Sequence, residues 1–340
     1  MKNKICTVSA VGIDVAKATL SVCFRSHEGV ENALTLRNIE ADIRKKLLPR
    51  LNGYQGKIVM ESTGHYHWAA TLLLKEAGLD VRVVNPLLAK QYTSGTIRKV
   101  KTDPADASGL ARMASVADNL PPPFSLTPEK LHARKKLAVI GSMSHQLQAL
   151  SASLKSLKEA DGILGMKNSP AEEEIEKAVR VLRRSLAHAE EEFTVDMRKV
   201  DESTMNLLAS IPGVSDFCAS MALHWFDVGL GDTPKAWIAY AGLDVSSRES
   251  GTWRGQCHLT KRGNSYFRAR LFCSAWGAVM HDEDMKKYYT SLKAQGRAHV
   301  EALVIVSRKI VRMMFMMLQT KLPYDPSLIQ KQVSVLAGTV

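Results

Sequence analysis

The sequence predicts an α/β domain, then a helical coiled-coil hairpin, then a mainly helical C-terminal domain. Three observations support this order: short β-branched runs alternate with helical segments over 1–128, a leucine-rich heptad pattern fills 129–205, and helical periodicity dominates 206–340. We take these three ranges as the expected domains, because a chain of 340 residues has ample material for a core.

The charge distribution indicates a polyanionic partner. The net charge is +12, with 17 basic and 11 acidic residues in 1–128, 16 and 10 in 206–340, and equal numbers between them. Such an excess suggests nucleic acid. Five scattered cysteines without a C-x-x-C pair argue against a disulfide scaffold or a zinc knuckle. Because signal-peptide and membrane-helix patterns are missing, we expect a cytoplasmic protein without a membrane partner.

The first domain should open with a meander of three strands. A β-branched run at 4–13 ends at Asp14, and a later short strand delivers Glu61, so two expected strands each end in a carboxylate. The expected elements are strands at 4–13, 18–25 and 32–37, a helix at about 39–51, a strand Lys57–Met60, a helix His65–Ala77, a strand Val81–Val84, and a helix from Asp103.

The helix from Asp103 follows a basic run. Thr102 can cap it, and Pro104 suits its first turn. Asp103 and Asp106 are three residues apart and therefore share one helix face. Acids at a helix start can also merely complement its dipole, so the pair gains weight only from other carboxylates nearby. The basic residues in front are candidate nucleic-acid contacts: Arg98, Lys99 and Lys101.

Four carboxylates are expected to meet: Asp14, Glu61, Asp103 and Asp106. An RNase-H-like α/β sheet would gather acids in this chain order at its carboxyl edge. Close carboxylates repel one another unless cations screen them, and oxygen ligands suit Mg²⁺ or Mn²⁺. Two such ions can activate a nucleophile and stabilise the leaving oxygen in phosphodiester transfer. We therefore expect a metal site, against the alternative of unrelated acids near strand ends.

Residues 129–205 predict two helices that pair through an apolar seam, with a hairpin at Gly165 to Pro170. Because this region has no net charge, we expect it to serve assembly or spacing, as in a homo-oligomer, and not catalysis. The seam consists of Leu147, Leu150, Leu154 and Leu157 in the first helix and Ile175, Val179, Leu182, Leu186, Ala189 and Phe193 in the second.

The last domain begins with a pattern typical of a helix-hairpin-helix, in which Pro212 and Gly213 form the hairpin. Amides of such a hairpin can bind a phosphate without reading sequence, which makes Gly213 a candidate nucleic-acid contact. A tight turn between two core helices would have the same pattern. Both interpretations stay open, and the remainder, 266–322, is expected to be helical.

A loop-like stretch between these helices, 246–264, contains Ser250 next to Gly251. A serine in a basic loop could attack phosphorus while neighbouring cations neutralise the phosphate. The residues alone do not choose Ser250 over Ser246 or Ser247. The basic candidates are Arg248, Arg254, Lys261 and Arg262.

Motifs at both ends of the chain, over about 4–118 and 206–280, resemble the insertion sequence 110 family of DEDD transposases. The region between them fits only as a coiled coil of suitable length. The motifs are V-G-I-D-V-A-K at 11–17, M-E-S-T-G at 60–64, V-N-P-L-L-A-K-Q-Y at 84–92, K-T-D-P-A-D-A at 101–107, I-P-G-V at 211–214, and A-Y-A-G-L-D, S-G-T and T-K-R-G-N between 239 and 264.

The resemblance implies a RuvC-like domain and a C-terminal transposase domain joined by a coiled coil. It places the DEDD set on Asp14, Glu61, Asp103 and Asp106, and the serine that becomes attached to DNA on Ser250. It further implies a noncoding bridge RNA that pairs with donor and target DNA, homo-oligomers from dimer to tetramer, and action at a prokaryotic nucleoid.

Two segments depart from the family pattern. Ser215, Asp216 and Phe217 follow I-P-G-V where glycine and smaller residues are usual, which weakens the phosphate role of the hairpin. The segment Trp253 to Leu259 is bulkier than expected beside Ser250.

Three other functions remain open from the sequence. The same acids could serve a structure-selective endonuclease, of the Holliday-junction-resolvase kind, that uses water as the nucleophile. A DNA invertase of the same fold is a related possibility. The chain could also be a non-catalytic nucleic-acid-binding scaffold.

Overall fold

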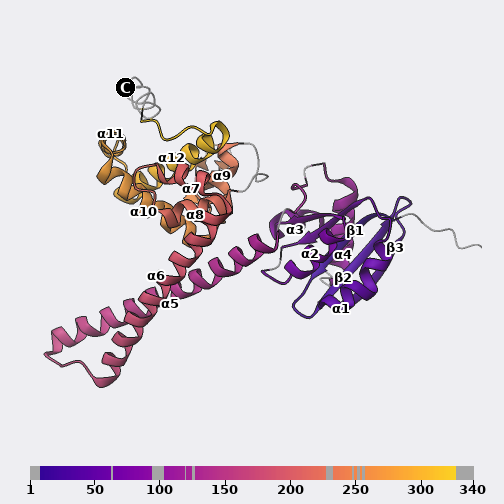
Figure 1. Ribbon diagram of the computed structural model, residues 1–340, viewed down its shortest axis with the longest axis horizontal. Helices are drawn as coiled ribbons and strands as arrows, with labels where there is room; N and C mark the ends of the chain where they lie inside the picture. The colour runs from indigo at the N-terminus through magenta and orange to yellow at the C-terminus, as the bar shows by residue number, and fades with distance from the viewer. Residues whose placement is uncertain are drawn as a thin grey trace, which may run out of the picture. The chain divides into compact units, whose positions relative to one another are not determined.

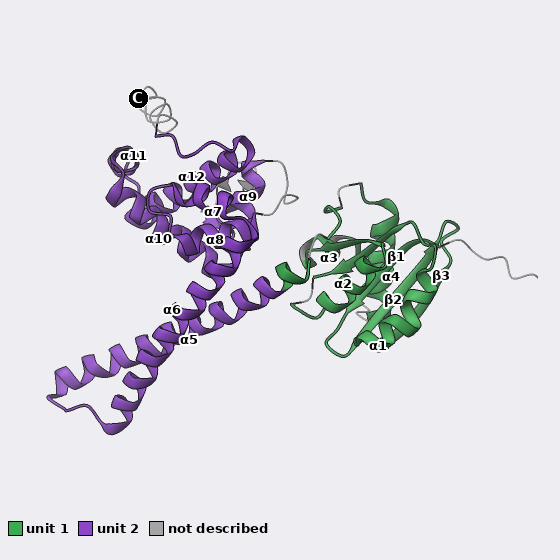
Figure 2. Cartoon of the chain, in the orientation of Figure 1, with its two compact units in different colours: residues 1–131 green, residues 132–340 purple. Residues whose placement is uncertain are grey.

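The computed structural model divides into two compact units, residues 1–131 and 132–340 (Figure 2). None of the helices in the described part of the chain combines the length and apolarity that a membrane crossing requires. The residues that the structure describes are 8–62, 64–93, 103–118, 120–124, 127–226, 233–246, 249–250, 253–254 and 257–326.

The first unit is built on a five-stranded mixed sheet with the order β3-β2-β1-β4-β5. Figure 1 labels the strands β1, β2 and β3 of this sheet. The first three strands form the expected antiparallel meander, and β4 and β5 extend it in parallel. This is the RNase-H-like α/β arrangement that the sequence predicts. The strands are β1 (Val8–Val15), β2 (Thr19–Ser26), β3 (Glu31–Arg37), β4 (Lys57–Glu61) and β5 (Asp80–Val84).

Side chains alternate between two packed faces of the sheet. Val11 and Ile13 of β1 belong to one apolar cluster, which the helical segment 40–51 and α2 help to form, whereas Ala10 belongs to another with α3 and α4. The helical segments are α1 (Glu40–Asp42), the π-helical η1 (Ile43–Leu47), the 3₁₀-helical η2 (Leu48–Leu51), α2 (Trp68–Glu76), α3 (Pro86–Thr93) and α4 (Asp103–Val116).

Two long helices begin the helical region of the second unit: α5 (Pro128–Leu164) and α6 (Pro170–Val200). They are the two helices that the heptad spacing predicts. Ser169 starts α6 with a capping box, in which Glu172 accepts from the Ser169 amide. Ion pairs of Lys136 with Asp196 and of Lys158 with Glu176 join the helices.

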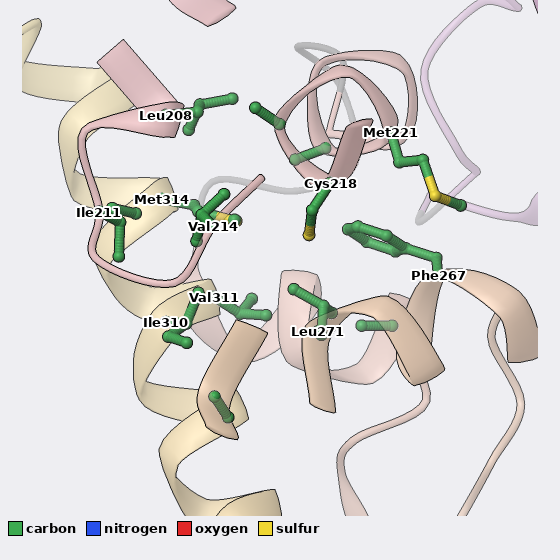
Figure 3. Packing of buried hydrophobic residues seen from close by; sticks show 14 of the residues in the cluster. Leu208, Ile211, Val214, Cys218, Met221, Phe267, Leu271, Ile310, Val311 and Met314 are labelled. Carbon is green, nitrogen blue, oxygen red and sulfur yellow. The ribbon is translucent and has the colours of Figure 1, made fainter. Parts of the chain in front are cut away.

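The base of these helices packs into the C-terminal core, since Leu137 and Phe193 share one buried cluster with the later helices. Figure 3 shows Ile211 and Val214 facing Leu271, Ile310 and Met314 in this core. The later helices are α7 (Glu202–Ala209), α8 (Asp216–Trp225), α9 (Pro234–Tyr240), α10 (Ser265–His281), α11 (Glu283–Ala294) and α12 (His299–Thr320).

Candidate functional site

Asp14 and Glu61 lie side by side at the carboxyl edge of the sheet. β1 and β4 are parallel, and Ile13 pairs with Met60, so the next positions along the two strands are Asp14 and Glu61. The expected end of the first strand is too early, because β1 continues to Val15 and places Asp14 inside the strand. Parallel register and not a strand terminus therefore brings these two acids together.

Gly12 lets α4 pack closely against the face of β1 that carries Asp14. A Cβ atom at Gly12 would lie 2.2 Å from the Ala107 carbonyl oxygen and 2.2 Å from the Ala111 nitrogen, so the backbone of α4 presses directly on β1. Residues two apart in a strand point to the same side, so Asp14 shares the α4 face with Gly12. The first turn of α4 carries Asp103 and Asp106.

The charges of the other three carboxylates act on Asp14. Burial raises the pKa of Asp14, the negative charges of Asp103, Asp106 and Glu61 add to this effect in that order, and the pKa reaches about 6. Asp103 is exposed, whereas Asp14, Glu61 and Asp106 are half-buried. The site therefore concentrates negative charge at a position that solvent reaches.

This donor set suits a hard divalent cation in its chemistry, because all four groups offer oxygen. Within the described ranges, however, no three acidic, histidine or cysteine side chains stand close enough to form a ready-made metal cluster. Burial is the main cause of the raised pKa of Asp14, and the charges of the neighbouring acids add to it; a bound cation would offset that repulsion. The four oxygen donors thus fit a divalent cation in their chemistry.

Ser250 lies in a β-hairpin and not in an irregular loop. Ser250 pairs with Trp253, and closer to the core Val245 pairs with Leu259. Strands of two residues are too short for a periodicity signal, although the two-residue, glycine-containing spacing between Ser250 and Trp253 is typical of a tight hairpin. The short strands are β6 (Val245–Ser246), β7 (Glu249–Ser250), β8 (Trp253–Arg254) and β9 (His258–Leu259).

The base of this hairpin is a closely packed neck, formed by residues 241–244 and 260–263. The Thr260 amide donates to the Asp244 carbonyl oxygen at 3.0 Å. Arg268 Nη1 donates to the carbonyl oxygens of Ala241 at 3.4 Å and Gly263 at 3.3 Å. A Cβ atom at Gly263 would lie 2.0 Å from the Tyr240 carbonyl oxygen, so only glycine fits there. The neck fixes where the hairpin leaves the core.

Several candidate nucleic-acid contacts can be placed around the neck. Lys261, with a φ of 52°, and Arg262 are exposed beside it. Ser246 is exposed in β6. For Ser250 and Arg254 the structure describes the backbone, and the remaining candidates Arg98, Lys99, Lys101, Ser247 and Arg248 lie outside the described residues.

Gly213 turns the chain between α7 and α8 in a left-handed conformation, with a φ of 80°. A Cβ atom there would lie 2.2 Å from the Ala278 nitrogen and 2.5 Å from the Ser274 carbonyl oxygen of α10. Packing against α10 is therefore sufficient reason for glycine at this position. The phosphate-binding interpretation of the hairpin stays a prediction.

Gly213→Ala is expected to lower the free energy of unfolding by about 2–4 kcal/mol, because it adds left-handed strain to a clash with helix backbone. Gly165→Ala provides the control, since Gly165 has a φ of 64° but an open surrounding, and should cost only about 1 kcal/mol. Urea unfolding of both variants measures the difference. Equal losses would contradict the close contact with α10.

Sequence comparisons cover both candidate sites. A family model for DEDD transposases of the insertion sequence IS110 matches residues 11–159, which include all four acids. A second model, for transposases of the IS116/IS110/IS902 family, matches residues 205–290, which include the serine hairpin.

Relatives extend the similarity over nearly the whole chain. The pilin gene-inverting protein of Moraxella lacunata is 24% identical over 335 residues, which is 93% of this chain and 97% of that protein. A 43.6 kDa protein of insertion element IS110 from Streptomyces coelicolor is 30% identical over 120 residues, 35% of this chain and 30% of that protein. A solved structure, "T. thermophilus RuvC in complex with Holliday junction substrate", is similar with a TM-score of 0.26 and 15% identity, over 34% of this chain and 98% of that one.

Proposed function

Because this chain belongs to the IS110 family of transposases and is an enzyme of the DNA transposase and recombinase class, we propose that it exchanges DNA strands through a covalent phosphoserine intermediate. The observation that carries this proposal is the pairing of two separate features. Four interacting carboxylates lie on the α4 face of the first unit, and a serine lies near the tip of a hairpin in the second.

Asp14, Glu61, Asp103 and Asp106 would hold Mg²⁺ or Mn²⁺. When bound, such ions polarise a phosphate and stabilise the leaving oxygen. The Ser250 oxygen bonds to phosphorus while the bond from phosphorus to a deoxyribose oxygen breaks, and that oxygen takes up a proton. A hydroxyl of another strand then reverses the step. In each step one ester bond to phosphorus forms as another breaks, and the attacking hydroxyl loses a proton as the leaving oxygen gains one, so strands are exchanged without hydrolysis.

The partners follow from charge and from the family. The net charge of +12 supports binding of donor and target DNA together with a noncoding bridge RNA, which would carry the sequence information. The acids and the serine lie in different units of the chain. A homo-oligomer, from dimer to tetramer, assembled through α5 and α6 would let one copy supply the acids and another the serine.

Ser250→Ala is expected to abolish a denaturation-resistant protein–DNA adduct, since no other group would form the phosphoester. Wild-type protein is incubated with DNA of the element, the noncoding RNA of the element and Mg²⁺, and is then denatured and resolved by electrophoresis. Ser246→Ala, an exposed serine of the same hairpin, is the control and should retain the adduct. Free cleaved ends that persist in Ser250→Ala would instead establish a metal-dependent, structure-selective endonuclease that uses water.

DNA inversion is the second candidate outcome, favoured by the similarity to the pilin gene-inverting protein over 93% of this chain. Inversion and transposition share the same strand exchange and differ in how the recombining sites are arranged. A plasmid that carries two element ends in inverted orientation distinguishes the two functions. Inversion reverses the segment between the ends, whereas transposition removes it from the plasmid.

A further inference from the structure

Two arginines of α12 lack an ion-pair partner in the part of the chain that the structure describes. Arg308 and Arg312 are four residues apart and are therefore neighbours on one side of the helix. Both are half-buried. Ile310 and Met314, on the opposite side of α12, point into the core, as Figure 3 shows. Two like charges thus lie together at the edge of an apolar core.

Arg308 has unused hydrogen-bonding capacity. Its Nε atom is buried and donates to no acceptor among the described residues. Burial lowers the pKa of its guanidinium, Arg312 lowers it further, and Asp244 is the acid that opposes these effects. Asp244 in turn accepts a hydrogen bond from the Thr260 hydroxyl. Because a guanidinium stays charged at neutral pH, the pair retains an excess of positive charge.

Lys309, between the two arginines, is already accommodated. It is 3% exposed, and its ammonium nitrogen lies 4.5 Å from the centre of the Tyr288 ring. Burial and the charge of Arg312 lower its pKa to about 8. The three adjacent cations are costly to hold together without an anion. The two arginines are therefore the residues whose N–H groups can donate hydrogen bonds to an anion.

The position of this pair relates it to the serine hairpin. α12 packs against α9, where the ring centres of Phe315 and Trp237 lie 5.0 Å apart, and α9 leads directly into the neck of the hairpin. The charge of Asp244, which directly precedes β6 and lies six residues before Ser250, acts on Arg308. An extended strand rises about 3.3 Å per residue, so Ser250 lies within about 20 Å of Asp244. The family match ends at residue 290, so α12 lies outside the matched segments.

We propose that Arg308 and Arg312 bind a backbone phosphate of the DNA strand that Ser250 attacks, near the scissile phosphate. The proposal rests on the proposed function, because the reach of the hairpin selects DNA as the occupant. Guanidinium groups suit this role, since they bind phosphate oxygens in a bidentate manner. The pair would hold the strand in place and take no part in bond making.

The test compares DNA binding by the full-length wild type and R308Q/R312Q. Affinity for a fluorescent DNA duplex of about 40 base pairs is measured between about 50 and 200 mM salt. The magnitude of the slope of log K against log salt falls by about 0.9 for each phosphate contact that is lost, so the variant, which loses its contact with one phosphate, should have a slope smaller by about 0.9. R180Q/R184Q removes two exposed arginines at the same spacing in α6 and should keep the wild-type slope.

An unchanged slope in R308Q/R312Q, or an equal loss in the α6 control, overturns the site. A loss seen with an RNA duplex of the same length but not with DNA also overturns it and assigns the arginines to RNA. If the double variant does not fold, the single variants R312Q and R312K are compared instead. R312K keeps the positive charge and should retain the wild-type slope, whereas R312Q should have a smaller slope.

The adduct assay separates this site from the serine reaction. If the adduct depends on Ser250 but R308Q/R312Q keeps the wild-type slope, the serine reaction is supported and the phosphate site is ruled out. A reduced slope without any adduct in the wild type supports the phosphate contact and removes the phosphoserine mechanism.

Discussion

Gly12→Ala is expected to reduce strand exchange by about 100-fold and to lower the free energy of unfolding by about 1–3 kcal/mol. The new methyl group would lie 2.2 Å from two backbone atoms of α4, so the helix has to move. Its first turn carries Asp103 and Asp106, and a shift of about 1 Å there would separate them from Asp14 and Glu61. Adduct formation and urea unfolding measure the two effects.

Gly141→Ala is the matched control. Gly141 lies in α5, and a Cβ atom added to it would meet no other atom within 4 Å, so alanine should stabilise the helix by about 0.5–1 kcal/mol and leave strand exchange intact. Wild-type activity in Gly12→Ala would show that the positions of the acids do not depend on the contact between β1 and α4.

Asp14→Asn should stabilise the metal-free protein while it abolishes catalysis. The pKa of Asp14 is raised to about 6 in the folded state from an ordinary value of 3.8, so the folded state keeps a proton that the unfolded state has lost. Wild-type stability therefore falls as pH rises from about 4 to about 6, by about 1–3 kcal/mol, and stays lower above it. Asparagine cannot ionise, so the variant does not lose stability over this pH range. Because a metal ligand is lost, strand-exchange activity should fall at least about 1,000-fold.

Thermal melting with and without Mg²⁺ tests this prediction across that pH range. At pH values above the Asp14 pKa, Mg²⁺ should raise the melting temperature of the wild type and leave Asp14→Asn unchanged. Asp42→Asn is a control of opposite sign, because hydrogen bonds from Arg37 and Lys46 hold the pKa of Asp42 well below its usual range. It should lower stability and leave the Mg²⁺ response intact. A pH-independent wild type would contradict the carboxylate cluster.

The four acids can be picked out from the sequence because Asp14 and Glu61 follow apolar, β-branched runs and Asp103 and Asp106 are three residues apart. The exact geometry cannot, since it depends on the register of β1 with β4 and on the contact between Gly12 and α4. The helix α3 is absent from the expected elements, although Pro86 is a favoured first helical residue. Its sequence stands out only as part of a family motif.

The second unit is harder to predict for a different reason. The hairpin around Ser250 is held by strands of two residues each, which leave no periodic signal. Arg308 and Arg312 lie in α12, within the range 266–322 that the sequence correctly predicts to be helical. That the buried Nε atom of Arg308 has no acceptor among the described residues is visible only in the tertiary structure. The periodicity of a sequence indicates which residues are buried, whereas a charge without a partner can be recognised only in the tertiary structure.

The neck beneath the serine hairpin has a consequence for how such an enzyme can diversify. The contacts of Gly263 and Arg268 that anchor the hairpin involve backbone atoms, so they do not depend on which side chains the tip carries. The bulky segment from Trp253 to Leu259 lies beyond this anchor. Substitutions in this segment can change the surroundings of Ser250 while α10 and α12 keep their packing. The chemistry at the serine can therefore vary between relatives without a change of fold.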